Sequence, residues 1–261
     1  ICNAEIFKAN ANKYNFYDKF RIIKFDINNF LFSEDRLNIV DVKIDINKIK
    51  KNLLNNHREY ILECFKVAFK ILKKKITYKL LNGPINKKKI LGNKYLGMTE
   101  YISENFNRKK TSMLIYNKNL SVCPITTHSP IKLISKKITR KLIQTHIKII
   151  NEFYKDKFGY KPKIGVTGLN PHCESILEFN EDRKIITPAI KLAKQKKFFV
   201  SGPFSADTIF LKQNRKKFNV ILGMYHDQVI APMKTLYEYD AINITMGLPF
   251  LRVSPDHGPN E

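Results

Sequence analysis

Three of the six histidines in this chain each follow a short apolar run bounded by glycine or proline, a pattern typical of buried strands. These histidines are His128, His172 and His226, and the runs before them are residues 113–116 and 122–125, 164–166, and 220–222. Because ligands of open α/β sheets bind beyond the carboxyl ends of the strands, we expect the three imidazoles at one edge of a sheet. No two histidines have the i,i+4 spacing of a helical pair, so a metal bound there would take its ligands from three separate loops.

Strand-like and helix-like segments alternate along the chain, which favours α/β layers over an all-β or all-helical fold. Apolar residues recur at helical spacing in three further segments, residues 59–75, 139–157 and about 181–197. Strands are also expected at residues 21–25, 39–44 and 77–81. A length of 261 residues with 43% apolar content suffices for one large or two small domains.

The net charge of +24 first suggests a partner rich in phosphate, such as a nucleic acid. Only eight of the 47 basic residues are arginine, and the lysines occur in short groups scattered among isoleucine and asparagine. There is no basic tail and no aromatic-rich binding motif. We therefore expect no specific nucleic-acid partner, and a basic RNA-binding protein is the third interpretation, behind two others given below.

Neither a disulfide framework nor export is indicated. The four cysteines have no Cys-x-x-Cys spacing and are interpreted as reduced thiols. No signal peptide is recognisable, and no apolar run approaches the roughly 20 residues that cross a bilayer. We expect a cytoplasmic protein without membrane association.

Seven motifs follow one another along roughly two thirds of the chain. They are LNGPINK (81–87), GMTE (97–100), TTH (126–128), GLNPH (168–172), GPFSADT (202–208), MYHDQ (224–228) and INITMGLPFLRVSPDHG (242–258). Together they resemble the 4-hydroxythreonine-4-phosphate dehydrogenase family of pyridoxal phosphate synthesis. The resemblance implies two α/β/α domains around a cleft, similar to isocitrate and isopropylmalate dehydrogenases. The first would span residues 1–95, and the second, with the metal and substrate motifs, residues 96–261.

The resemblance also implies a reaction. Family members oxidise 4-phosphohydroxy-L-threonine with NAD or NADP to 2-amino-3-oxo-4-phosphohydroxybutanoate, which loses carbon dioxide to give 3-amino-2-oxopropyl phosphate. A divalent ion of zinc, magnesium or cobalt suits both steps, because it polarises the hydroxyl and stabilises enolate charge. A homodimer with its active site at the interface is implied too. No Gly-x-Gly-x-x-Gly follows a strand, so NAD rests on resemblance and its binding residues are unassigned.

Residue roles are carried over by motif position. The catalytic metal ligands are His128, His172 and His226, and the substrate-binding residues are Thr99, Lys234, Asn243 and Arg252. Arg252 is the strongest substrate candidate, because a guanidinium fork suits a phosphate or carboxylate. Lys234 is one of many lysines and is singled out only by its motif.

The remaining polar residues in or near these motifs are assigned less specifically. Asp207 and Asp227 could orient the histidines, although Asp207 could equally cap a helix. We interpret His57 and His146 as surface residues and leave His257 unassigned.

The chain departs from the family at several places. Met98 stands where the family has a substrate-contacting histidine, and residues 173–178 lack the glycines that follow the family's second metal histidine. The family's glycine-rich N-terminal segment and its C-terminal continuation have no counterpart, so a fragment or an eroded gene product is expected. Two alternatives to the family reaction stay open: an inactive remnant that keeps the fold, and a dehydrogenase for a related phosphorylated four-carbon hydroxy acid.

Overall fold

A computed structural model describes residues 1–14, 19–24, 26, 35–44, 53–95, 97–174 and 179–258 of the chain. The chain divides into two compact units. Unit 1 comprises Ile1–Leu80 and Ile85–Leu96, and unit 2 comprises Leu81–Pro84 and Gly97–Glu261. None of the helices in the described part is both long and apolar enough to cross a lipid bilayer.

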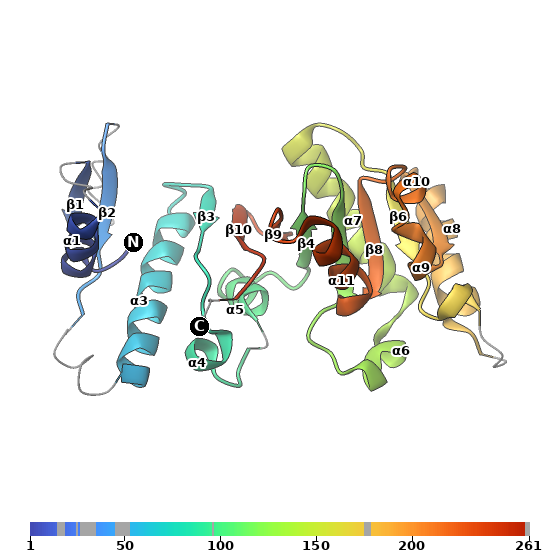
Figure 1. Cartoon of the computed structure of the whole chain (residues 1–261), viewed down its shortest axis with the longest axis horizontal. Helices are drawn as coiled ribbons and strands as arrows, with labels where there is room; N and C mark the ends of the chain where they lie inside the picture. Colours follow the sequence, from blue (N-terminus) through green and yellow to red (C-terminus); the bar gives the residue numbers. More distant parts are fainter. Residues whose placement is uncertain are drawn as a thin grey trace. The chain divides into compact units, whose positions relative to one another are not determined.

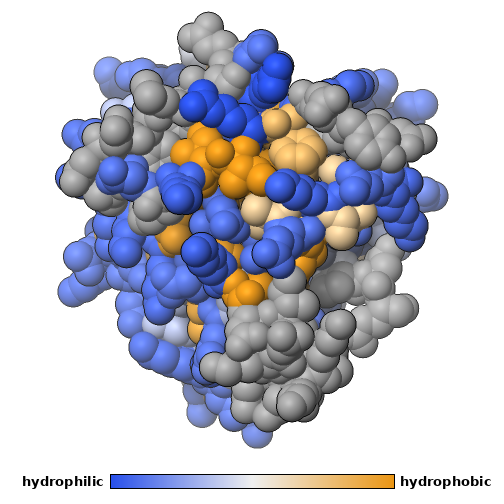
Figure 2. Space-filling view, turned by 90° about the vertical axis from the view of Figure 1, so that its left-hand side faces the viewer, coloured by the Kyte–Doolittle hydropathy of each residue, from blue (hydrophilic) through white to orange (hydrophobic). Residues whose placement is uncertain are grey.

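Unit 1 is a small α/β unit. Its elements are α1 (Ala4–Lys13), β1 (Phe20–Lys24), β2 (Leu37–Asp41), α3 (Leu53–Lys73) and α4 (Lys87–Leu91). β1 and β2 pair in parallel. α3 packs Val67 and Ile71, four residues apart on one helical face, against Val40 of β2 and Val42 just after it. On the face of the molecule shown in Figure 2, some hydrophobic residues lie among hydrophilic ones.

Unit 2 is built on a mixed sheet. The strands are β3 (Lys79–Leu81), β4 (Ser112–Tyr116), β5 (Ser121–Thr126), β6 (Ile164–Thr167), β7 (Val200–Phe204), β8 (Val220–Tyr225), β9 (Ile242–Met246) and β10 (Leu251–Pro255). Their order among the described residues is β3-β10-β9-β4-β5-β8-β6-β7. β5, β8, β6 and β7 are parallel, whereas β4, β9 and β10 pair in antiparallel fashion. The adjacent parallel strands β5, β8 and β6 therefore end at the same edge.

Helices cover both faces of this sheet (Figure 1). The helices of unit 2 are α5 (Met98–Asn105), α6 (Ile134–Lys137), α7 (Arg140–Phe158), α8 (Thr187–Gln195), α9 (Ala206–Ile209), α10 (Lys212–Arg215) and α11 (His226–Tyr237), with short 3-10 turns at Ile131–Leu133 and Pro171–Cys173. One core cluster joins α7 and α8 to the sheet, and another joins α9 and α11 to it. Both ends of α7 are capped by residue types that favour helix ends. The side chain of Thr139 accepts a hydrogen bond from Leu142 N at 3.1 Å, and Gly159, at φ 77°, ends the helix.

The mixed α/β fold with one large sheet agrees with the sequence prediction, and the arrangement of two domains around a cleft stays a prediction. The helix expected at about 181–197 begins as a π-helical turn, Asp182–Ile186, before α8. His57 is exposed, as expected.

The interpretation of His146 as a surface residue was wrong. His146 is 7% exposed and lies on the inner face of α7, beside Ile143 and Ile147. Its Nδ1 donates to the carbonyl oxygen of Leu142 at 2.9 Å, which satisfies one ring nitrogen inside the core. Burial lowers the pKa of His146 below its usual value. Lys148, two residues further along α7, is exposed, because nearby residues of a helix occupy different faces.

Candidate functional site

The carboxyl ends of β5 and β8 bring two of the predicted histidines together. Thr126 of β5 is in register with Tyr225 of β8, so both strands end at the same level. His128 lies two residues beyond β5, and His226 is the first residue of α11, directly after β8. Both histidines line a cavity of about 160 Å³ at this edge.

Each of these imidazoles has a carboxylate at its Nδ1. His226 Nδ1 lies 2.7 Å from Asp227 Oδ1, and His128 Nδ1 lies 3.9 Å from Glu100 Oε1. The two imidazole side chains are 39% and 36% exposed. A carboxylate within hydrogen-bond distance of Nδ1, as Asp227 is for His226, holds the ring and leaves Nε2 as the nitrogen for another ligand. The contact with Asp227 is the geometry expected of an orienting residue.

His172 does not line that cavity. It lies in the 3-10 turn after β6, where His172 and Cys173 have φ of 56° and 61°. The carboxylate of Asp207 lies within electrostatic reach of His172. The pKa of Asp207 is lowered first by the hydroxyl of Ser205, which donates to Asp207 Oδ1 at 2.6 Å, and further by His172. Ser205, not Asp207, occupies the position before α9, so Asp207 is a first-turn residue rather than the cap.

Among the residues that the structure describes, no three His, Cys, Asp or Glu side chains gather closely enough to hold a metal ion. The structure brings His128 to His226 and leaves His172 apart, so the three-histidine site stays a prediction. The segment after Glu174, residues 175–178, lies outside the described residues. The imidazoles of His128 and His226 on one cavity are nevertheless nitrogen donors of the kind that zinc and cobalt prefer.

A buried arginine forms the second polar group of unit 2. Arg252 of β10 is 2% exposed, and its Nε donates to Asn82 Oδ1 at 3.0 Å. Its Nη1 donates to Thr245 Oγ1 at 3.1 Å, and that hydroxyl lies 3.3 Å from Thr99 Oγ1. No carboxylate in the described part of the chain forms an ion pair with Arg252, and burial lowers its pKa to about 10. We name Asn82, Thr99, Thr245 and Arg252 the arginine cluster. A buried cation that lacks a counterion favours binding of an anion.

The other predicted substrate residues lie on β9, α11 and α5. Asn243 of β9 has a buried Oδ1 without a hydrogen-bond partner among the described residues, which leaves an acceptor for a ligand. Lys234 is ion-paired rather than freely solvated: its Nζ lies 2.6 Å from Oδ2 of Asp256, a carboxylate with a 1% exposed side chain. Met98, the first residue of α5, is 4% exposed and precedes Thr99 of the arginine cluster.

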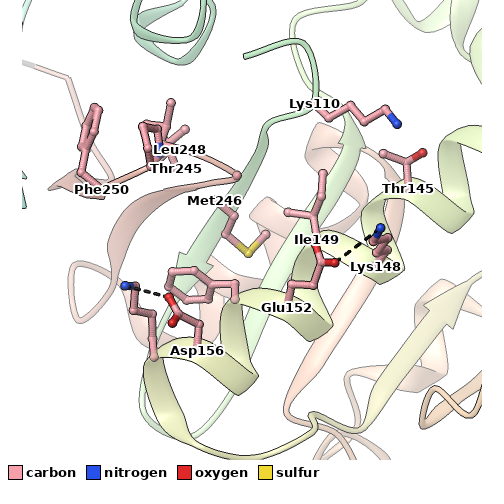
Figure 3. Close-up of a pocket in the computed structure, with 14 residues that line it drawn as sticks. Lys110, Thr145, Lys148, Ile149, Glu152, Asp156, Thr245, Met246, Leu248 and Phe250 are labelled. Atoms are coloured by element: carbon pink, nitrogen blue, oxygen red, sulfur yellow. Dashed lines mark ion pairs between the residues drawn. The ribbon is translucent and has the colours of Figure 1, made fainter. Parts of the chain in front are cut away.

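A larger cavity, of about 500 Å³, lies between α7 and residues 245–250 (Figure 3). Its charged side chains are partly paired, with Lys148 Nζ at 3.5 Å from Glu152 Oε1 and Lys157 Nζ at 2.8 Å from Asp156 Oδ2. No histidine lines this cavity. Its size therefore does not make it the catalytic candidate.

Comparison with known proteins identifies the family. The chain matches the family described as "Pyridoxal phosphate biosynthetic protein PdxA" over residues 1–260. The chain belongs to this family. The motif-based resemblance is thereby confirmed, and membership places the chain among oxidoreductases associated with pyridoxal phosphate synthesis.

Several PdxA relatives are similar along most of this chain. A 4-hydroxythreonine-4-phosphate dehydrogenase of Sulfurihydrogenibium sp. is 37% identical over 85% of this chain and 68% of its own length. A D-threonate 4-phosphate dehydrogenase of Pectobacterium atrosepticum is 31% identical over 87% of this chain and 72% of its own. The crystal structure of a 4-hydroxythreonine-4-phosphate dehydrogenase from Klebsiella pneumoniae superimposes with a TM-score of 0.79 at 27% identity, covering 98% of this chain and 80% of that chain.

Three further side chains of this PdxA family member were not predicted from the sequence as site residues. They are Glu100 at His128, and Asp182 and Gln228, which hydrogen-bond the segments that carry His172 and His226. Glu100 and Gln228 belong to the GMTE and MYHDQ motifs, so the motifs contained the only signal.

Proposed function

We propose that this chain is a metal-dependent and NAD- or NADP-dependent dehydrogenase that oxidises the secondary alcohol of 4-phosphohydroxy-L-threonine. The product, 2-amino-3-oxo-4-phosphohydroxybutanoate, then decarboxylates to 3-amino-2-oxopropyl phosphate. The observation that carries the proposal is the pair of His128 and His226 on one cavity, each with a carboxylate at Nδ1.

His128 and His226 would hold the divalent ion, with His172 as the third ligand. When bound, zinc, magnesium or cobalt polarises the substrate hydroxyl and stabilises the negative charge that develops during decarboxylation. Asp227 would keep the imidazole of His226 oriented through Nδ1, and Glu100 lies near His128. A homodimer with its active site at the interface belongs to the proposal, since the cavity of one chain holds only two of the three histidines.

The substrate phosphate and carboxylate would bind to fixed donors. Arg252 supplies a guanidinium without a carboxylate partner, and Thr99 supplies a hydroxyl in the first turn of α5. Lys234 and Asn243 would complete the substrate contacts. NAD or NADP would supply the acceptor for the hydride, and we assign no residue to its binding.

A second candidate is a related substrate, D-threonate 4-phosphate, which carries a hydroxyl in place of the amine. It is favoured by the similarity to the Pectobacterium enzyme of that name.

The test combines metal content with coenzyme reduction. The purified protein should bind roughly one zinc or cobalt ion per active site and reduce NAD with one of the two substrates. His128→Ala, His172→Ala and His226→Ala should each lower both quantities, and the exposed His57→Ala is the matched control. Unchanged metal content in a variant that lacks all three histidines would refute the ligand assignment.

A further inference from the structure

Gln228 has a fully engaged side-chain amide beside the proposed metal site. It is the third residue of α11, two positions after His226, and it is 8% exposed. Its Oε1 accepts from the backbone N of Met224 at 2.7 Å and from Thr167 Oγ1 at 2.8 Å. Its Nε2 donates to the carbonyl oxygen of Gly168 at 2.7 Å.

These bonds connect the strand ends from which the histidines leave. Met224 belongs to β8, two residues before His226, whereas Gly168 follows β6 and lies four residues before His172. The hydroxyl of Thr126, in the last position of β5, donates to the carbonyl oxygen of Met224 at 2.8 Å. One buried network thus reaches the ends of β5, β8 and β6.

The network continues from Gly168 towards His172 through a second buried side chain. Asp182 is 1% exposed, and its carboxylate accepts from Leu169 N at 2.7 Å and from Asn170 N at 3.1 Å. A Cβ on Gly168 would come within 2.5 Å of Asp182 Oδ1. Gln228 and Asp182 therefore both hold the backbone that starts at Gly168. This segment leads to His172, whose own backbone is in the left-handed conformation.

Packing also fixes Gln228 from the side of β8. A Cβ on Gly223 would come within 2.3 Å of Val229 Cγ1 and 3.2 Å of Gln228 Oε1. Only an amide fits the three bonds, since the position needs an acceptor at one end and a donor at the other. Glutamate retains the shape but loses the donor to Gly168.

We propose that Gln228 is a positioning residue that fixes the directions in which the segments bearing His172 and His226 leave the sheet, and thereby sets the affinity for the metal. This inference rests on the proposed function, because it takes the metal to bind at these histidines. Residues that hold metal ligands in place typically affect metal affinity by roughly 10- to 100-fold.

The experiment measures zinc affinity by calorimetry on the full chain, together with the melting temperature and the coenzyme-dependent activity at rising zinc. Gln228→Glu should weaken zinc binding by about 10- to 100-fold, and saturating zinc should restore most of the activity. The same change in the exposed Gln213→Glu, on α10, is the control and should leave the affinity unchanged.

A milder pair guards against a variant that does not fold. Thr167→Val removes one of the three bonds to Gln228, whereas Thr167→Ser keeps the hydroxyl. The valine variant should bind zinc several-fold more weakly than the serine variant at similar melting temperatures.

The outcomes separate this inference from the proposed function. Wild-type affinity in both Gln228→Glu and Thr167→Val, or a lowered melting temperature with unchanged affinity, overturns the role of Gln228 and leaves the metal site standing. Zinc binding that is absent from the wild-type protein overturns both.

Discussion

Unit 2 has two polar groups, the arginine cluster and the pair of His128 and His226. They differ in how exposed their side chains are and in how many hydrogen bonds these side chains make within the chain. The imidazoles of His128 and His226 are more than a third exposed, and a carboxylate lies near Nδ1 of each. Arg252 is 2% exposed and already donates to two side chains. The hydrogen bonds of the arginine cluster therefore form within the chain as it folds, whereas the imidazoles of His128 and His226 remain accessible to a ligand.

The contrast follows from the elements that carry each group. Arg252 of β10 pairs in register with Thr245 of β9, so the two side chains lie on the same face and meet without help from a loop. His128 and His172 lie in connections beyond their strands, and His226 lies at a helix start. The register of β9 and β10 sets the geometry of the arginine cluster. The positions of the histidines depend instead on the buried hydrogen bonds that hold the ends of their strands.

Arg252→Met gives the largest expected effect and separates binding from folding. Loss of a charged, hydrogen-bonded anchor should lower kcat/KM roughly a hundredfold, with most of the change in KM. The melting temperature should stay the same or rise, because an apolar side chain of similar length replaces a buried charge without a counterion. Steady-state kinetics and calorimetry measure the two effects.

The exposed Arg183→Met provides the matched control for Arg252. An Arg252→Met protein that loses stability but keeps its KM would show that the arginine cluster serves the fold alone.

Met98→His tests whether the arginine cluster lacks one donor. Met98 is buried next to Thr99 in the chain, at the position where the motif resemblance implies a substrate-contacting histidine. An added hydrogen bond to a bound anion should raise kcat/KM for 4-phosphohydroxy-L-threonine by at least about fivefold. The comparison requires that metal and NAD binding equal those of the parent.

An unchanged turnover in Met98→His would mean that another residue has taken over the contact or that the substrate differs. Assay of the same variant with D-threonate 4-phosphate distinguishes the two, because a gain restricted to one substrate identifies the one whose amine or hydroxyl the imidazole reaches.

The sequence predicted the parts of this fold that leave a local pattern. The apolar runs at 164–166 and 220–222 fall inside β6 and β8, and the threonine and glycine that bound α7 are ordinary capping signals. The proximity of His128 and His226 followed from the parallel order of β5 and β8, and parallel strands place their ends together.

Contacts between distant segments could not be predicted in the same way. Gln228 bonds Gly168 across 60 residues, and Arg252 bonds Asn82 across 170 residues. Neither contact produces any periodicity in the sequence. The burial of His146 was not predicted because its neighbours in the sequence are polar. Its position along α7, on the same face as Ile143 and Ile147, is what buries it.

The smallest expected effect concerns His146, a histidine that belongs to neither polar group. Burial lowers its pKa in the folded chain, so the imidazole is neutral in both states above the usual pKa of about 6.5. As the pH falls below that value, the unfolded chain takes up the proton first, and the free energy of unfolding therefore decreases.

His146→Leu places an apolar side chain at this position of α7 and removes this proton uptake. Chemical denaturation between pH 7 and pH 5 should show a shallower loss of stability in the variant, by at most about one proton in the slope. The same substitution at the exposed His57 is the matched control. Equal slopes for His146→Leu and the parent would show that the imidazole is protonated inside the fold, and that burial does not lower the pKa of His146.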